Sequence, residues 1–320
     1  MNDDKTKQQP QWERELLEQL ASDALKERRR GRRWGIFFKL LTFTYIGLLI
    51  YIAMPDALDL EKMDKKKPHT ALVELEGVIS PAQGISADTV VEGLRDAFED
   101  KNTKAVILRI NSPGGSPVQS SYIQKEIKRL REKHEDIPLY AVVSDICASG
   151  GYYVASAADR IYVNESSIVG SIGVLMNGFG FTEAMEQLGV ERRLMTAGDH
   201  KAILDPFSPM SEFDRAHAQS LLEELHGNFI EVVKQGRSDK LDPREDVFNG
   251  LFWSGPRAIE LGLADEIGSA GYVAREVVGE DRIVDFTPED DPLERLADRL
   301  GAAAANTFAE ISGLVSTPRM

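Results

Sequence analysis

The chain has 320 residues and a formal net charge of −14 at pH 7, which allows one large domain or two ordinary ones. This acidity argues against nucleic acid as the main partner, because phosphate binding needs a basic surface. The single cysteine, Cys147, excludes an intrachain disulfide and a cysteine-rich zinc site, and the five histidines lack paired ligand spacing, so we expect no metal and no cofactor.

The clearest signal near the N-terminus is an apolar stretch. Residues 1–33 are highly charged and predict a loosely ordered cytoplasmic tail, whereas the twenty residues 35–54 are apolar except for Lys39, Thr42 and Thr44, and with Trp34 they form the segment 34–54. Twenty helical residues at ~1.5 Å each span ~30 Å, the thickness of the hydrocarbon core of a bilayer. The stretch therefore predicts one transmembrane helix in a lipid bilayer.

The flanking residues of this stretch bear on orientation and on the alternatives. The basic run "KERRRGRR" precedes it, and the positive-inside rule then leaves the N-terminus cytoplasmic and the rest of the chain outside. A cleaved signal peptide would have a shorter apolar core and a small-residue cleavage site, which "IYIAMPDALDL" lacks. A buried core helix is the other alternative.

A polar linker, residues 55–68, leads into a region where strands and helices alternate. We expect a domain over residues 69–284 and a weakly structured tail over 285–320. The expected strands are "TALVELEGVI", "KAVILRI", "PLYAVVS", "RIYVN" and "SIVGSIGVL". The expected helices are 87–100, 118–134, 150–158, roughly 209–236, a short one within 254–268, and 270–279. This alternation predicts an α/β layer structure with mostly parallel strands.

Two glycine-rich turns follow two consecutive buried strands, at the strand ends where open α/β folds place ligands. Gly114 and Gly115 belong to the first turn, and Gly150 follows Ser149 in the second, at the start of an expected helix. Two backbone N–H donors beside a serine hydroxyl can form an oxyanion hole. Each stretch taken alone is better explained as a tight turn. Their order and strand context favour a catalytic site.

A serine nucleophile needs a base. One candidate is His200, although the adjacent Asp199 would have difficulty orienting it. The other is Lys201, since a lysine can serve when burial brings its pKa down from ~10.4 towards neutrality, and apolar residues follow it. A lone lysine is more often a solvated surface charge, and the residues alone leave this choice open.

Four segments in order, "INSPGGS", "ICASGGYYVASAADRIY", "SIVGSIGV" and "AGDHKAILDPFSPM", resemble the signal peptide peptidase A family of serine-lysine membrane proteases. The resemblance covers about residues 70–278 and implies a Clp-protease/crotonase-like spiral of βαβ units. It also implies a role for each of six residues: Ser149 as nucleophile, Lys201 as general base, Gly115 and Gly150 as oxyanion donors, Gly114 as a turn former, and Ser171 as a hydrogen-bond partner of the lysine.

The resemblance further implies what the chain does. We expect an endopeptidase of the bacterial inner (cytoplasmic) membrane whose catalytic domain, in the periplasm or outside the cell, degrades released signal peptides and other apolar peptides. It also implies a homo-oligomer with active sites at subunit interfaces, so that Lys201 of a neighbouring subunit could serve Ser149. Cys147 is interpreted as a small buried hydrophobic residue.

Two rival functions are also compatible with the sequence. A crotonase-like enzyme acting on acyl-thioesters would use the same pair of amides, with carboxylates expected in the site. A non-catalytic membrane scaffold would use the glycines only for close packing.

Overall fold

The computed structural model describes residues 28–48, 67–82, 84–237, 239–242 and 246–288, and it divides the chain into two compact units. In the first unit, residues 28–48 are helical and exposed. No helix among the described residues is both long and apolar enough to cross a bilayer. The last six residues of the predicted span, 49–54, lie outside the described residues, as do residues 1–27 and 289–320 of the predicted tails.

The second unit, residues 61–290, contains all the strands described. These are β1 (His69–Glu76), β2 (Thr103–Ser112), β3 (Leu139–Ala148), β4 (Arg160–Val163), β5 (Ile168–Gly170), β6 (Phe252–Ser254), β7 (Glu266–Ile267) and β8 (Ile283–Asp285). The helices are α3 (Ala87–Glu99), α4 (Pro117–Lys133), α5 (Gly150–Ala155), α6 (Thr182–Gln187), α7 (Glu212–Arg237), α8 (Gly255–Glu260), α9 (Ala270–Tyr272) and the π-helix η2 (Val273–Val278).

The strands form one sheet in the order β6-β5-β3-β2-β1-β8, with β4 pairing with β3 and β7. Every pairing between these strands is parallel except that of β5 with β6. The predicted α/β structure with mostly parallel strands is confirmed. The βαβ spiral implied by the resemblance stays a prediction.

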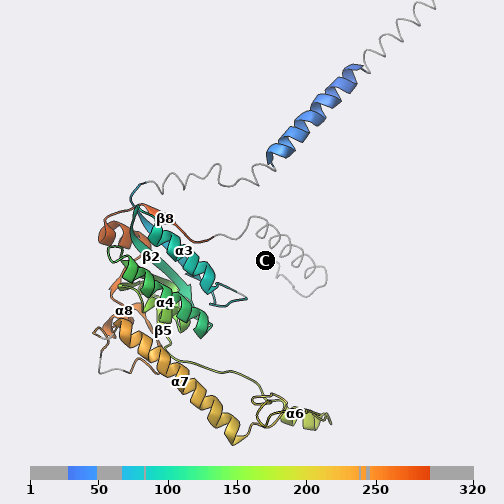
Figure 1. Ribbon diagram of the computed structural model, residues 1–320, viewed down its shortest axis with the longest axis vertical. Coiled ribbons are helices and arrows are strands. Elements are labelled where there is room, and N and C mark those ends of the chain that lie inside the picture. Colours follow the sequence, from blue (N-terminus) through green and yellow to red (C-terminus); the bar gives the residue numbers. More distant parts are fainter. Residues whose placement is uncertain (1–27, 49–66, 83, 238, 243–245, 289–320) are drawn as a thin grey trace, which may run out of the picture. The chain divides into compact units, whose positions relative to one another are not determined.

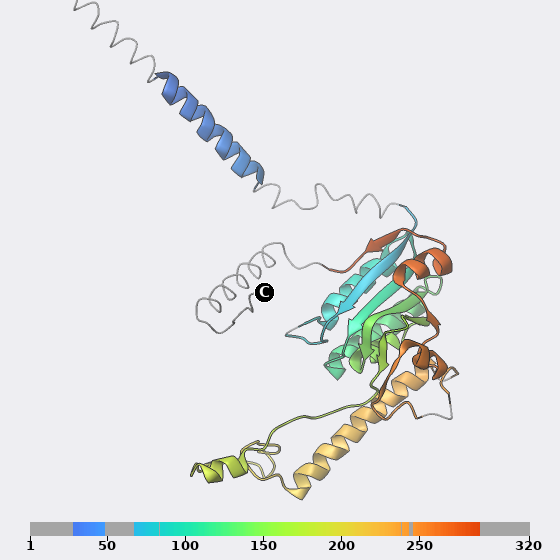
Figure 2. The ribbon, with the colours of Figure 1, turned by 180° about the vertical axis from the view of Figure 1, so that it is seen from behind.

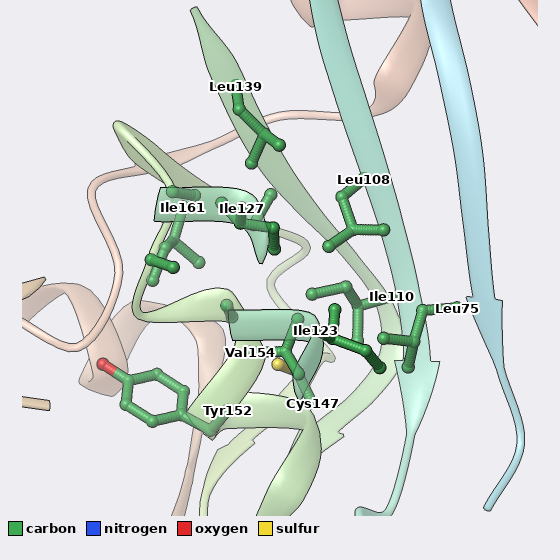
Figure 3. Packing of buried hydrophobic residues seen from close by; sticks show 14 of the residues in the cluster. Leu75, Leu108, Ile110, Ile123, Ile127, Leu139, Cys147, Tyr152, Val154 and Ile161 are labelled. Atoms are coloured by element: carbon green, nitrogen blue, oxygen red, sulfur yellow. The ribbon is translucent and has the colours of Figure 1, made fainter. Parts of the chain in front are cut away.

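The central strands are buried on both faces, which explains their continuous apolar sequences. Alternate residues of β2 enter two different clusters: Leu108 and Ile110 join the large core, and Ile107 joins a smaller one. The large core lies between the sheet and helices α3, α4 and α5, and Figure 3 shows Ile123 of α4 beside Cys147 and Val154. The smaller cluster packs the other face of the sheet against α9 and η2.

Helix α4 begins where the first glycine-rich turn ends, and its sequence explains this start. The Ser116 side chain caps the helix by accepting a hydrogen bond from the backbone N–H of Gln119, and Pro117 occupies the first turn. Ile123 and Ile127 recur one turn apart and are fully buried. The helix is thereby held against the sheet directly after the turn.

Helix α7 has 26 residues, and its C-terminal half carries the buried side chains, Phe229, Val233 and Arg237. The segment 174–211, called the arm below, precedes it and contains α6, which has no buried residue. Figures 1 and 2 show α6 near the N-terminal end of α7, away from the sheet. The predicted strand "SIVGSIGVL" is shorter than expected, since β5 ends at Gly170 and the chain continues into the arm.

Candidate active site

Three parallel strands, β2, β3 and β5, end at the same edge of the sheet. Their register pairs Ser112 with Cys147, and Ala148 with Gly170. The next residues along the chain, Ser149 after β3 and Ser171 after β5, therefore emerge side by side. The backbone N–H of Ser149 donates to the carbonyl of Gly170 at 2.9 Å and fixes this arrangement.

Ser149 has an unusual backbone conformation, with φ 50° and ψ −120°. A positive φ is unfavourable for a residue with a Cβ atom, and such strain costs on the order of 1–3 kcal/mol. The chain turns sharply at Ser149 from β3 into α5, which begins at Gly150. The turn places the serine side chain at the end of the strand, where it borders a cavity.

The two predicted oxyanion donors lie together beside this serine. A Cβ atom added to Gly114 would lie 2.6 Å from the nitrogen of Gly150 and 2.8 Å from the Cβ of Ser149. A Cβ added to Gly150 would lie 3.2 Å from the nitrogen of Gly115. The N–H groups of Gly115 and Gly150 have no acceptor among the described residues, so both can donate to a ligand.

Hydrogen bonds hold the first glycine-rich turn in place. The Ser112 hydroxyl donates to the carbonyl of Gly77 at 2.6 Å and accepts from the N–H of Gly114 at 3.1 Å. The N–H of Ser116 donates to the carbonyl of Ile79 at 2.8 Å. Both Gly114 and Gly115 have positive φ values, of 100° and 148°, which a glycine adopts without strain.

A cavity of about 770 Å³ opens in front of Ser149, and Gly115, Gly150 and Ser171 also line it. Much of its apolar lining comes from α4, α5, the start of the arm and α7, and includes Val118, Tyr122, Tyr153, Leu175, Leu225 and Phe229. None of the described residues around it is acidic. The carboxylates expected for a crotonase-like site are therefore not present among the described lining residues.

Ser171 is the second residue with a Cβ atom and a positive φ in this region, at 55°. Its N–H donates to the carbonyl of Leu251 at 2.7 Å, and the imidazole Nε2 of His226 donates to the carbonyl of the next residue, Ile172, at 3.1 Å. These contacts tie the turn after β5 to the chain before β6 and to α7. Sequence reasoning did not single out His226.

The predicted base lies elsewhere. Lys201 is exposed in a turn of the arm and does not line the cavity. The neighbouring candidate, His200, stacks on Phe213 with the ring centroids 3.9 Å apart, also outside the cavity. The structure therefore brings together Ser149, Gly114, Gly115, Gly150 and Ser171 but, within one chain, not Lys201.

Cys147 and Lys125 lie in different surroundings near the site. Cys147 is fully buried among apolar side chains (Figure 3), and desolvation raises the pKa of its thiol, so its interpretation as a buried hydrophobic residue is confirmed. Lys125 of α4, which sequence reasoning passed over, lines the cavity. Nothing in the sequence distinguishes it from the other lysines of the helix.

The site combines an α/β fold with a serine on a strained turn between a parallel strand and a helix, beside two free backbone amides. This combination has the groups that acyl transfer to a serine hydroxyl would need. Residues 131–282, which include Ser149, Ser171 and Lys201, match the model of peptidase family S49. A candidate protease of Synechocystis is 30% identical over 257 residues, which cover 75% of this chain and 90% of that relative. The chain belongs to peptidase family S49.

Other relatives match over smaller shares of their own length. A candidate signal peptide peptidase of Enterococcus faecium is 32% identical over 70% of this chain and 64% of its own length. A Brucella abortus protein named Na(+)/H(+) antiporter NhaA is 46% identical over 187 residues, 58% of this chain but 25% of that protein. The chain thus spans a quarter to about two thirds of these relatives, and the antiporter's name describes that larger protein.

Proposed function

We propose that this chain is a serine endopeptidase in which Ser149 is the nucleophile and Lys201 of a second copy is the general base. The observation that carries the proposal is the strained turn at Ser149, next to the free N–H groups of Gly115 and Gly150 in one cavity. Backbone strain of this kind persists where the surrounding structure maintains it for a function. Membership of a peptidase family supports the same reaction.

The character of the arm supports a base from a second copy. Exposed apolar side chains recur along it, with exposures of 81% for Leu175, 76% for Phe179, 78% for Leu188 and 96% for Met195. Large apolar side chains that are exposed in this number on one segment favour an interaction site there. Because the cavity of one chain contains Ser149 but not Lys201, a second copy docked through the arm would complete the site.

The mechanism then follows from the groups present. The neutral amine of Lys201 accepts the proton of the Ser149 hydroxyl while Oγ attacks the peptide carbonyl carbon. The oxyanion accepts hydrogen bonds from Gly115 and Gly150, each of the kind worth ~3 kcal/mol in a transition state. The ammonium returns the proton to the leaving amine, and water, activated by the same amine, hydrolyses the acyl-enzyme. Ser171, beside Ser149, would accept a hydrogen bond from the ammonium.

The substrate we propose is an extended, apolar peptide. Aromatic and aliphatic side chains dominate the cavity wall, and glycine turns leave room for a backbone to approach Ser149. Anchoring through residues 34–54 would hold the domain at the outer face of a bacterial cytoplasmic membrane, where its substrates would be released signal peptides and other apolar peptides. This anchoring rests on the sequence alone.

The experiment that tests the shared site mixes two inactive variants. Ser149→Ala keeps the base and Lys201→Ala keeps the nucleophile, so a mixed assembly contains some sites with both groups. We expect each variant alone to be inactive in peptide hydrolysis and the mixture to recover part of the activity. Co-purification of two differently tagged variants would establish that mixed assemblies form.

Two results would contradict the proposal at different points. Absence of recovery in verified mixed assemblies would exclude a base from a second copy. A serine-directed fluorophosphonate that labels Ser149→Ala as well as it labels the wild type would exclude Ser149 as the nucleophile.

The contact between copies is tested separately. Met195→Asp in the arm should lower the mass of the oligomer measured by light scattering, and an unchanged mass would exclude the arm as the contact between copies.

A further inference from the structure

Helix α4 presents two different faces. Ile123 and Ile127 enter the core (Figure 3). Val118, Tyr122 and Lys125 border the cavity in front of Ser149. Residues three, four and seven apart share one side of a helix, so these three form a continuous strip along the cavity. The strip begins with an apolar residue beside the first glycine-rich turn and ends with a cation.

Lys125 differs from the other cations of α4. Each of the others has a partner: Lys128 donates to Gln235, Arg129 pairs with Glu126, Arg131 pairs with Asp159, and Lys133 pairs with Glu99. The Lys125 ammonium has no hydrogen-bond or ion-pair partner among the residues that the structure describes. The one cation of the helix that faces the cavity is thus left available to a ligand.

The surroundings of Lys125 favour an anionic ligand. None of the described residues that line the cavity carries a carboxylate, and apolar side chains cover much of its wall. The chain after residue 67 carries 41 acidic and 24 basic residues, so an unpaired cation inside a substrate cavity stands against the overall charge. A lysine ammonium placed there attracts an anion and repels a cation, which makes it a selectivity element.

We propose that Lys125 forms a subsite that binds a carboxylate of the peptide substrate; this inference rests on the proposed function and adds a specificity to it. Helix α4 starts next to the oxyanion turn, and eight residues at ~1.5 Å each place Lys125 ~12 Å further along the helix. An extended peptide advances ~3.3 Å per residue. The preferred carboxylate is therefore about four residues from the scissile bond.

Two parts of a peptide can supply this carboxylate. One is the free C-terminus, which a peptide already released from a precursor has and an intact membrane segment lacks. The other is the side chain of Asp or Glu within a longer chain. Both offer the same charge-assisted hydrogen bond to the ammonium. They are separated by the peptides used in the experiment.

The experiment compares kcat/KM for fluorescence-quenched peptides of one apolar sequence. In one set the peptide ends three, four or five residues after the scissile bond, with either a free or an amidated C-terminus. In another, a longer amidated peptide carries Glu or Gln at the same distances on either side of that bond. At the distance that suits the subsite, we expect the wild type to cleave the peptide with the carboxylate about fivefold faster than its amide partner. This factor corresponds to the free energy of one exposed charge pair.

The variants then assign the preference to Lys125. Lys125→Met should bring the carboxylate-to-amide ratio to about one, and Lys125→Glu should invert it, so that a Lys-containing peptide becomes preferred. Lys133→Met removes the same charge from the same helix outside the cavity and should leave the ratio unchanged. Equal cleavage of paired peptides by the wild type, or a preference retained in Lys125→Met, would overturn the proposal.

A binding measurement separates this proposal from the proposed function. Calorimetry of Ser149→Ala with the same paired peptides reports the subsite without requiring hydrolysis. If the carboxylate peptide binds more tightly than the amide peptide, and this difference disappears on adding Lys125→Met, the subsite is supported. Failure of the wild type to cleave any of the peptides would then refute only the protease reaction. Equal binding of the paired peptides refutes the subsite.

Discussion

The two halves of the proposed catalytic dyad lie in regions of opposite character. Ser149 is held by strand register, by the hydrogen bond to Gly170 and by glycines packed against its turn. Lys201 lies in the arm, where α6 has no buried residue. Contacts within the arm include the Arg192–Asp205 ion pair at 3.3 Å. The serine and the two free amides are thus assembled by one chain, whereas the proposed base lies in an exposed segment.

The largest effect that this comparison predicts is functional and leaves stability untouched. Lys201→Ala should lower kcat on the order of 10⁶-fold, as removal of a catalytic base does in a serine protease. Because Lys201 is exposed, the free energy of unfolding should change by less than about 0.5 kcal/mol. Peptide hydrolysis and urea denaturation measure the two quantities. Arg193→Ala, also exposed in the arm, is the control. Near-normal activity of Lys201→Ala would remove that lysine from the mechanism.

The pH profile sharpens the same comparison. An amine that accepts the serine proton must be unprotonated, so hydrolysis by the wild type should rise with pH through the titration of the base and then reach a plateau. The residual hydrolysis by Lys201→Ala should lack this limb. A profile with the same rising limb in both proteins would assign the limb to another group.

The next effect concerns stability where α7 joins the compact region. Arg237 is 1% exposed, donates to Asp265 at 2.6 Å, and its guanidinium also binds the carbonyl of Gly262. Asp265→Asn leaves that guanidinium charge buried without its partner, so we expect a loss of about 3–5 kcal/mol in the free energy of unfolding. Arg95→Met, which removes a more exposed ion pair, should cost less than about 1 kcal/mol. Equal losses in the free energy of unfolding for Asp265→Asn and Arg95→Met, measured by urea denaturation, would contradict the difference expected between a buried and an exposed ion pair.

The same ion pair predicts a dependence on pH. Burial acts to raise the pKa of Asp265, but hydrogen bonds from Arg237 and Lys240 outweigh it, and the net pKa is lowered. A lowered folded pKa gives a contribution that is present above the unfolded value, about 3.9, and is lost as pH falls through the folded value. Urea denaturation between neutral pH and about pH 3 should therefore show a smaller acid-induced loss in Asp265→Asn than in the wild type.

Much of the compact region could be predicted from the sequence, because its elements are long and strongly patterned. The predicted strand 104–110 and helix 118–134 correspond to β2 and α4, and the predicted helix at about 209–236 corresponds to α7. Ser149 was expected at a strand end beside glycines, and the structure has it there. Hydrophobic periodicity over a long segment is sufficient to predict the type and approximate bounds of a helix or strand.

The rest depended on tertiary contacts that no local pattern reveals. Strand β6 pairs antiparallel with β5 through three residues, too few for a periodic signal. Strand β8 pairs with β1, and Phe286 behind it is buried, although the sequence from 285 predicted a weakly structured tail. The position of Lys201 relative to Ser149 depends on the path of an exposed arm. In the sequence Lys125 is indistinguishable from a solvated lysine, because only the fold shows the cavity beside it.

A smaller effect is expected inside the compact site itself. A Cβ at Gly150 would lie 2.5 Å from the Ser120 hydroxyl oxygen and would crowd the N–H of Gly115. Gly150→Ala should therefore separate the two oxyanion donors and lower kcat about 100-fold, with little change in KM, as loss of one donor does. Gly271→Ala has open space for its methyl group and serves as the control. An unchanged kcat in Gly150→Ala would exclude this amide from the oxyanion hole.

The smallest effect tests how α7, which leads from the arm, supports the site. His226 donates to the carbonyl of Ile172, next to Ser171, and a neutral hydrogen bond contributes about 1 kcal/mol. His226→Ala should lower kcat about fivefold, and His226→Gln, which keeps a side-chain N–H donor, should recover most of it. Gln219→Ala, on the same helix and paired with Glu223, should have no effect. A purely structural role for His226 would instead lower the melting temperature of both His226 variants while sparing kcat at low temperature. Recovery of kcat by glutamine would mean that the hydrogen bond from α7 positions the turn at Ser171 beside Ser149.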